Sequence, residues 1–130
     1  MAVARGLADT SVFIAAESQR PLDVARMPDE LAVSVITIGE LRAGVLAAAD
    51  VSVRDRRLTT LMRALALTPV PIDSEVADAW ATLRVMLRDR GLRMPVNDSW
   101  IAATALALGV PVVTQDADYV DLPGLSVVRV

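Results

Sequence analysis

The feature that most limits the fold of this chain is a repeated switch between short apolar runs and segments with helical periodicity. Residues 31–36 form a β-branched run without strand-breaking residues, and residues 110–114 and 125–130 are further compact apolar runs. Strands that alternate with helices in this way favour an α/β sandwich on a parallel sheet. The functional crevice of such a sheet lies at the carboxyl ends of its strands, so residues that follow these runs are the first candidates for a site.

The segments between the apolar runs carry the signals of helices. Ser74 is placed to cap a long helix that ends at Gly91, and Gly109 closes the helix before residues 110–114. We expect helices over residues 12–17, from 37 onwards, 54–66, 74–91 and 97–108. The stripe expected to pack inwards from residues 54–66 comprises Leu58, Leu61, Met62 and Leu65. Residues 68–72 contain two prolines, which restricts them to an extended or edge segment.

The length and composition favour one domain with an unusually apolar surface. The chain has 130 residues without a repeat or a linker-like tract, so we expect a single domain over residues 1–130. Hydrophobic residues make up 54% and aromatic residues only 3% of the chain. The longest uncharged stretch, 99–115, is interrupted by Gly109 and Pro111 and is too short for a membrane span. We therefore expect a cytoplasmic domain whose surplus apolar side chains meet a permanent partner.

Three absent residue types exclude much chemistry. The chain contains no Cys, no His and no Lys, and all thirteen basic residues are arginine. Disulfides, thiolate nucleophiles, His-ligated or Cys-ligated metals, imidazole bases, Schiff bases and a phosphate-binding P-loop lysine are therefore excluded. Any reaction must depend on carboxylates, hydroxyls, arginines, backbone groups and bound ions.

Four carboxylates occupy comparable places in the predicted layout. Asp9 follows a short apolar start that reaches Leu7 and Ala8, and Glu40 lies in the first turn of the helix after residues 31–36. Asp98 opens a later helix, and Asp116 follows residues 110–114. Asp118 comes two residues further on. In a parallel sheet these turns converge at one end.

Each carboxylate also has a purely structural explanation. Thr37 and Glu40 fit the T-x-x-E capping box, in which Glu40 serves only to satisfy a backbone N–H. Asp9 and Asp98 suit helix N-caps, and Asp116 suits a turn. The joint placement favours a site, because two carboxylates about 4 Å apart repel by roughly 4 kcal/mol at an effective dielectric near 20 and so need cations. Oxygen ligands without His or Cys select Mg²⁺ or Mn²⁺, which suits attack on a phosphate ester.

Four segments carry a family resemblance that covers essentially the whole chain. They read LADTSV at 7–12, SVITIGEL at 34–41, NDSWIAATA at 97–105 and VTQDADY at 113–119. In this order and spacing they resemble the VapC-type PIN-domain ribonuclease toxins of bacterial type II toxin–antitoxin pairs. The one departure is that about five residues precede the first segment.

The resemblance implies a three-layer α/β/α sandwich with a parallel sheet of about five strands. It implies a Mg²⁺-dependent or Mn²⁺-dependent endoribonuclease with an acidic site made by Asp9, Glu40, Asp98 and Asp116. On this hypothesis Asp9, Asp98 and Asp116 bind metal directly, and Glu40 holds a second metal or orients the attacking water. Asp118 is a lower-ranked ligand, and Ser11 and Thr114 are hydroxyls that orient the carboxylates or serve only as cap and turn residues.

The resemblance also implies partners. It implies RNA, often tRNA or ribosomal RNA, as substrate, a homodimer of the toxin, and a small VapB-like antitoxin. The antitoxin's C-terminal segment is expected to pack in an apolar groove and to send an arginine into the acidic pocket. The candidate groove residues, for which core packing is the alternative, are Phe13, Ile14, Leu41, Val45 and Leu46.

The acidic net charge of −3 runs against an RNA substrate, but bound metal offsets part of it, and some of the arginines are concentrated. The candidate RNA-binding residues, with a solvated helix face as the alternative, are Arg42, Arg54, Arg56, Arg57 and Arg63. Trp100 and Tyr119 flank the acidic segments and are candidates for base stacking, with core packing as the alternative.

Two other functions are compatible with the pattern. A phosphoacceptor receiver or a phosphoaspartyl hydrolase also places acids and Mg²⁺ at strand ends, but both depend on a lysine, which this chain lacks. A catalytically silent PIN-like interaction module is the second alternative.

Overall fold

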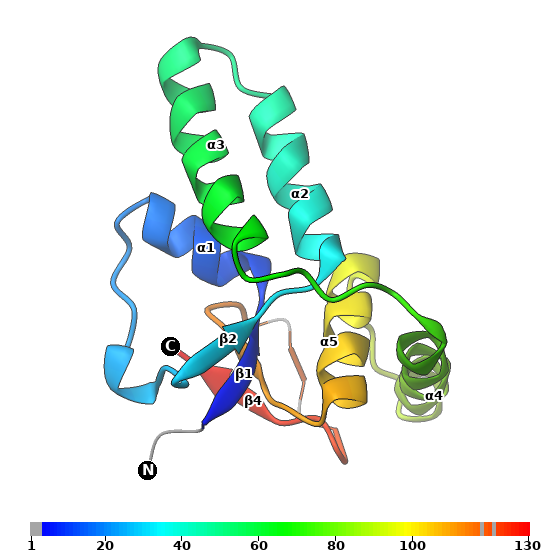
Figure 1. Cartoon of the computed structure of the whole chain (residues 1–130). Helices are drawn as coiled ribbons and strands as arrows, with labels where there is room; N and C mark the ends of the chain where they lie inside the picture. Colours follow the sequence, from blue (N-terminus) through cyan, green and yellow to red (C-terminus); the bar gives the residue numbers. More distant parts are fainter. Residues whose placement is uncertain (1–3, 118, 121) are drawn as a thin grey trace.

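The computed structural model describes residues 4–117, 119–120 and 122–130. Within these residues four strands form one parallel sheet in the order β2-β1-β3-β4 (Figure 1). The strands are β1 (Arg5–Ala8), β2 (Glu30–Ala32), β3 (Val112–Thr114) and β4 (Val127–Arg129). The parallel sheet confirms the predicted fold class, with four strands in the described part of the chain where about five were expected.

Helices cover both faces of the sheet. They are α1 (Thr10–Glu17), α2 (Val35–Leu46), α3 (Val51–Leu65), α4 (Ser74–Asp89) and α5 (Val96–Leu108), with a short 3₁₀ turn at Val24–Arg26. Leu7 and Val112 pack in a cluster with α4 and α5, whereas the next residues along their strands, Ala8 and Val113, pack against Val12 of α1. This alternation places α1 on one face and α4 with α5 on the other, which makes the three-layer sandwich. Figure 1 shows α2 and α3 as a helical pair that projects away from the sheet.

The strand predicted over residues 31–36 is shorter than expected. The structure ends β2 at Ala32 and begins α2 at Val35. Ser34 is the N-cap, since its Oγ accepts a hydrogen bond of 3.0 Å from the backbone N–H of Ile36. The second half of the β-branched run 31–36 is therefore helical, because Ser34 in its middle caps α2.

The proline-containing segment 68–72 extends the edge of the sheet. Val70 donates its backbone N–H to the Val33 carbonyl at 2.8 Å and accepts from the Val35 N–H at 3.1 Å. This single parallel bridge between Ser34 and Val70 is the edge element that the prolines predicted.

Four helices begin one to three residues before their predicted starts and the cap of α4 also differs, whereas the predicted helix ends at residues 17 and 108 are confirmed. Asp73, not Ser74, caps α4, because its Oδ1 accepts from the Val76 N–H at 3.0 Å. Helix α5 begins at Val96, so Asp98 lies inside its first turn rather than at its N-cap. Gly109 ends α5 with φ of +69°, a left-handed conformation in which glycine is favoured.

The predicted apolar stripe of α3 is only partly buried. Leu61 is fully buried, but Leu58 and Met62 are 40% and 60% exposed. Leu46 and Val51, at the tip of the α2–α3 pair, are also exposed. About half of the exposed large apolar side chains therefore lie on this projecting pair of helices. No helix in the described ranges is both long and apolar enough to cross a membrane.

Position 6 in β1 requires glycine, because neighbouring side chains leave no room for a Cβ. A Cβ added at this position would lie 2.6 Å from Val113 Cγ2 and 2.9 Å from Pro28 Cγ. We expect Gly6→Ala to lower the free energy of unfolding by about 1–3 kcal/mol, the usual cost of overpacking a core. Urea unfolding measures this change. The matched control is Gly39→Ala in α2, where an added Cβ meets nothing within 4 Å, and which should stabilise the helix by up to about 1 kcal/mol. Equal stability of the Gly6→Ala protein and the unmodified chain would contradict the expectation.

Candidate active site

Asp9 lies at the carboxyl end of β1 and is held by three hydroxyl groups. It is the N-cap of α1, as its structural explanation predicted, but its side chain does more than accept a weak 3.4 Å hydrogen bond from the Ser11 N–H. Oδ2 also accepts from the Ser11 hydroxyl at 2.7 Å and from the Thr114 hydroxyl at 2.8 Å. Oδ1 accepts from the Tyr119 hydroxyl at 3.0 Å. A buried carboxylate with this many donors is fixed in one orientation.

Two of these hydroxyls are themselves oriented by the turn after β3. The Gln115 N–H donates to Ser11 Oγ at 2.9 Å, and the Asp116 N–H donates to Thr114 Oγ1 at 2.8 Å. Each hydroxyl has one hydrogen, which it gives to Asp9, so its oxygen is the acceptor for the backbone. The two chains of hydrogen bonds tie the segment that carries Asp116 to the Asp9 carboxylate.

Glu40 is oriented by a hydroxyl group at the start of α1. The Thr10 hydroxyl donates to Glu40 Oε1 at 2.7 Å, and Thr37 Oγ1 lies 2.9 Å from Thr10 Oγ1. Because the Thr10 hydrogen is committed to Glu40, Thr37 is the donor in that pair. The capping-box explanation of Glu40 is wrong, since Ser34 caps α2 and Thr37 lies inside the helix.

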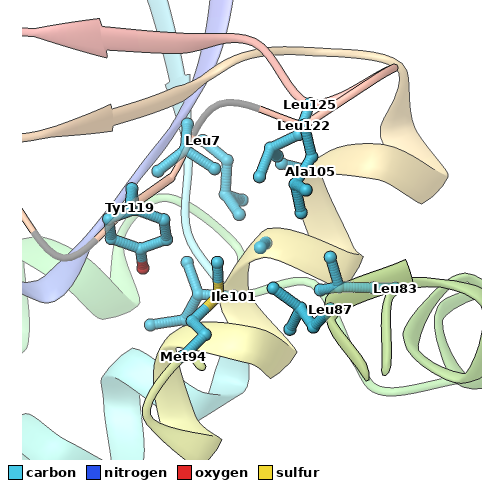
Figure 2. Close-up of a cluster of buried hydrophobic side chains, with 11 residues drawn as sticks. Leu7, Leu83, Leu87, Met94, Ile101, Ala105, Tyr119, Leu122 and Leu125 are labelled. Atoms are coloured by element: carbon cyan, nitrogen blue, oxygen red, sulfur yellow. The ribbon is translucent and has the colours of Figure 1, made fainter. Parts of the chain in front are cut away.

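Tyr119 is a buried neighbour of Asp9. Its side chain is 1% exposed (Figure 2). Burial raises the pKa of the Tyr119 hydroxyl far above its usual value, and the charges of Asp9, Asp98 and Glu40 and the hydrogen bond to Asp9 raise it further. Three of the four predicted acids therefore raise the pKa of the same hydroxyl. A residue this deeply buried cannot stack on a base, so that suggestion for Tyr119 is wrong; the signal available in the sequence was the chain's only tyrosine, directly after the last acidic segment.

The structure describes two of the remaining three predicted acids. Asp98 is half-buried in the first turn of α5, and Asp116 is half-buried directly beyond β3. Asp118 lies outside the described residues. Among the residues that the structure describes, no group of three acidic side chains is arranged as a metal-binding site.

The side-chain atoms of the site nevertheless suit a hard divalent cation as ligands. Every described side-chain atom that could bind a metal there is a carboxylate or hydroxyl oxygen. Mg²⁺ prefers oxygen, keeps several waters and is usually held by only one or two carboxylates together with substrate phosphates. Asp9 Oδ1 accepts one hydrogen bond, from Tyr119, and a carboxylate oxygen has room for a second partner.

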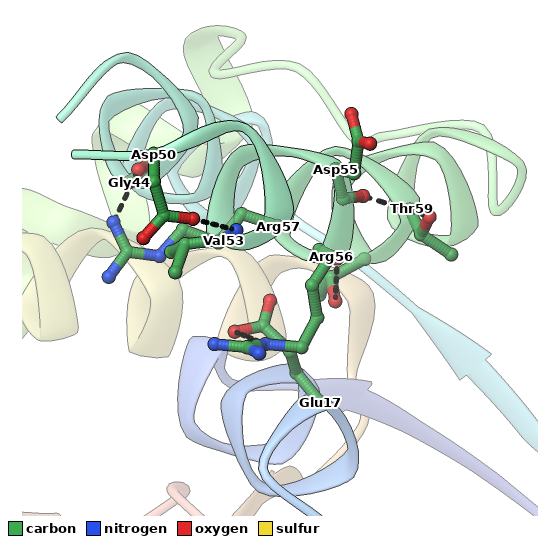
Figure 3. Close-up of polar contacts among 9 residues, drawn as sticks. Glu17, Gly44, Asp50, Val53, Asp55, Arg56, Arg57 and Thr59 are labelled. Atoms are coloured by element: carbon green, nitrogen blue, oxygen red, sulfur yellow. Dashed lines mark hydrogen bonds and ion pairs between the residues drawn. The ribbon is translucent and has the colours of Figure 1, made fainter. Parts of the chain in front are cut away.

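Two of the predicted arginines line a groove with Glu40. The groove, of about 380 Å³, lies between α1, α2 and α3, and its lining is Ile14, Glu17, Ser18, Glu40, Leu41, Gly44, Arg56 and Arg57. Figure 3 shows how these two arginines are held: Arg57 donates to the Gly44 carbonyl at 2.7 Å, and Arg56 lies 3.9 Å from Glu17. Arg42, Arg54 and Arg63 are exposed on α2 and α3.

Trp100 stacks on another indole ring of the chain. Its ring stacks on that of Trp80 with centroids 4.4 Å apart and planes 4° from parallel. Of the predicted groove residues, Leu41 and Val45 are buried beneath the α2–α3 pair with Phe13 packed against them, whereas Ile14 and Leu46 are exposed.

Comparison with known proteins identifies the family of the chain. The PIN domain family model matches residues 7–125. The chain is 47% identical to Ribonuclease VapC5 of Mycobacterium tuberculosis, over 98% of this chain and 94% of the relative, and 49% identical to Ribonuclease VapC4 of the same organism, over the full length of both. Its structure is similar to a crystal structure of VapBC-5, a toxin–antitoxin system from Mycobacterium tuberculosis, with a TM-score of 0.90 and 43% identity over 98% of this chain and 99% of that one. The chain therefore belongs to the PIN-domain family and is a VapC-like member of it.

Proposed function

We propose that this chain is a VapC-type toxin that cleaves RNA as a Mg²⁺-dependent endoribonuclease, with Mn²⁺ as a substitute. The observation that carries the proposal is the Asp9 carboxylate, fixed by the hydroxyls of Ser11, Thr114 and Tyr119. Asp98 and Glu40 add to the negative charge around the buried Tyr119 hydroxyl. Relatives named ribonucleases at 47% and 49% identity, matched over nearly their whole length, support it.

The proposed ligands are Asp9, Asp98 and Asp116, with Asp118 ranked below them. When bound, Mg²⁺ supplies Lewis-acid polarisation of a phosphoryl oxygen and lowers the pKa of a water, which suits a chain without histidine or lysine. Ser11, Thr114 and Tyr119 keep the Asp9 carboxylate in one orientation. Such outer partners govern how well a carboxylate binds metal.

Glu40 has a separate proposed role. It is half-buried on α2 and is oriented by the Thr10 hydroxyl at 2.7 Å. On our proposal its carboxylate holds a second ion or orients the attacking water. The groove that Glu40 shares with Arg56 and Arg57 supports an approach of RNA phosphates from this side.

The proposed protein partners are a VapB-like antitoxin and a second copy of the chain. The structure of VapBC-5, to which this chain is similar over nearly its full length, is described as a toxin–antitoxin system. The exposed apolar residues of α2 and α3, among them Leu46, Val51 and Met62, supply a surface for a bound segment. We place the activity in the cytoplasm, where tRNA and ribosomal RNA, the proposed substrates, are found.

Cleavage of labelled RNA by the purified chain, free of antitoxin, tests the function. We expect fragments in Mg²⁺ and in Mn²⁺ and none in EDTA, because the carboxylates need an ion to act on a phosphodiester. Cleavage that persists in EDTA would contradict the metal-dependent mechanism. A protein that binds Mn²⁺ but cuts no RNA would instead be a silent interaction module.

Tyr119→Phe removes one of the hydroxyls on Asp9 and leaves the ring in the core. We expect the affinity for Mn²⁺, measured by titration calorimetry, to fall about tenfold, at the lower end of the effect of outer-shell changes. Thr59→Val is the control, since the Thr59 hydroxyl donates to the Asp55 carbonyl on the exposed side of α3, away from Asp9. The same Mn²⁺ affinity in Tyr119→Phe and in the control would show that this hydroxyl does not position Asp9.

A further inference from the structure

A second arginine cluster lies at the end of α4, where the sequence predicted no site. Between residues 79 and 97 the chain has four arginines, Arg84, Arg88, Arg90 and Arg93, and one acid, Asp89. All four arginines are exposed. In a chain with a net charge of −3 this segment carries a local excess of positive charge.

Three of the four arginines surround one pocket. The pocket, of about 290 Å³, is lined by Arg84, Arg88 and Arg93 together with Leu87, Leu92 and Met94. Leu87 and Met94 are buried members of the main core (Figure 2), so the floor under the guanidinium groups is rigid. Among the described residues no acidic side chain lines this pocket, in contrast to the groove that holds Arg56.

The charges of the pocket are largely uncommitted. Within the described residues Arg84 and Arg93 make no ion pair, and the Arg84 guanidinium lies 5.4 Å from the centre of the Trp80 ring. Arg88 pairs with its neighbour Asp89 at 3.2 Å, but both side chains are exposed, and pairs of this kind are weak. The arginines predicted from the sequence are less available, since Arg56 and Arg57 contact Glu17 and Gly44.

The pocket is connected to the acidic centre through α5. Arg93 and Met94 directly precede this helix, whose first turn contains Asp98. Met94 belongs to the same buried cluster as Tyr119, on whose hydroxyl Asp98 acts. The Trp80 ring N–H donates to Ser99 Oγ at 3.0 Å, which ties α4 to the same turn of α5. The pocket is therefore built against the segment that carries Asp98.

We propose that the pocket of Arg84, Arg88 and Arg93 binds a backbone phosphate of the RNA, on the Asp98 side of the acidic centre. The inference rests on the proposed ribonuclease function. Guanidinium groups bind phosphate oxygens through paired, charge-assisted hydrogen bonds, and three of them around one pocket match a single phosphate. A contact to a backbone phosphate positions the RNA without selecting its sequence.

The test compares two double variants with the same change of charge. Arg84→Gln with Arg93→Gln alters the pocket, and Arg20→Gln with Arg26→Gln alters exposed arginines elsewhere. For the pocket variant we expect KM for RNA cleavage to rise about tenfold with kcat unchanged, the effect of losing charge-assisted hydrogen bonds to one phosphate. The slope of log kcat/KM against log salt should fall by roughly 0.7, the contribution of one phosphate on a single strand. Arg84→Lys with Arg93→Lys should restore most of the salt slope.

Two outcomes overturn the proposal, and a third separates its failure from that of the proposed function. A KM and a salt slope equal to those of the control pair would show that the pocket does not contact RNA. Unchanged RNA kinetics with lost affinity for a co-purified antitoxin would assign the pocket to an acidic protein segment. If the unmodified chain cuts no RNA, the proposed function fails, and fluorescence anisotropy of labelled RNA still decides whether the pocket variant binds more weakly than the control. Thermal melting verifies that every variant is folded.

Discussion

Asp9→Asn is expected to lower kcat for RNA cleavage by about a thousandfold, which corresponds to about 4 kcal/mol of transition-state stabilisation. Asp9 is 2% exposed and fixed by hydroxyls on both of its oxygens. An asparagine fits the same space but replaces the charge and one acceptor oxygen with an amide. We therefore expect a folded protein that no longer holds the divalent ion.

The control for this prediction is Asp73→Asn. It makes the same change of charge at the N-cap of α4, where Asp73 Oδ1 accepts a 3.0 Å hydrogen bond from Val76. Single-turnover cleavage of labelled RNA in saturating Mg²⁺ measures both variants. A rate for Asp9→Asn within a few-fold of the Asp73→Asn rate would remove Asp9 from the catalytic site.

The second large effect is a loss of stability at alkaline pH that depends on Tyr119 alone. The pKa of this hydroxyl is raised by burial and by the neighbouring carboxylates, from a normal value of 10.0. Below pH 10 both the folded and the unfolded chain carry the proton, and the contribution to stability is fully present. Above pH 10 the unfolded chain loses the proton while the folded chain keeps it, so the free energy of unfolding falls by up to about 1.4 kcal/mol per pH unit.

The composition allows this change in stability to be assigned to a single side chain. The chain has one tyrosine, no lysine and no cysteine, and arginine stays protonated, so no other side chain titrates in this range. Urea unfolding in EDTA at several pH values above 10 should show the slope in the unmodified chain and not in Tyr119→Phe. A parallel decline in both proteins would mean that the Tyr119 proton is not retained by folding.

Much of the site was predictable because its residues follow predictable elements. The positions of Asp9 and Asp116 depend on the ends of β1 and β3, and the apolar runs before them locate those ends. Gly109 fixes the end of α5 by its conformation. What local pattern did not reveal is that Ser34 begins a helix inside a β-branched run, because strand preference and capping compete there and the hydrogen bond to Ile36 decides the outcome.

Two features required the three-dimensional structure. Tyr119 and Asp9 are far apart in the chain, so no periodicity shows that the hydroxyl of one reaches the carboxylate of the other at 3.0 Å. Arg84 and Arg88 look like the solvated face of an amphipathic helix. Only the course of the chain after α4 brings Arg93 beside them and makes a pocket.

On our proposal the acidic site holds a divalent ion through Asp9. Anomalous diffraction from crystals of the active protein soaked in Mn²⁺ tests it most directly. We predict an anomalous peak for Mn²⁺ within bonding distance of Asp9 Oδ1, the oxygen that accepts the Tyr119 hydrogen bond, and no such peak in crystals of Asp9→Asn. Mn²⁺ bound elsewhere on an active protein, with no peak at Asp9, would contradict the account.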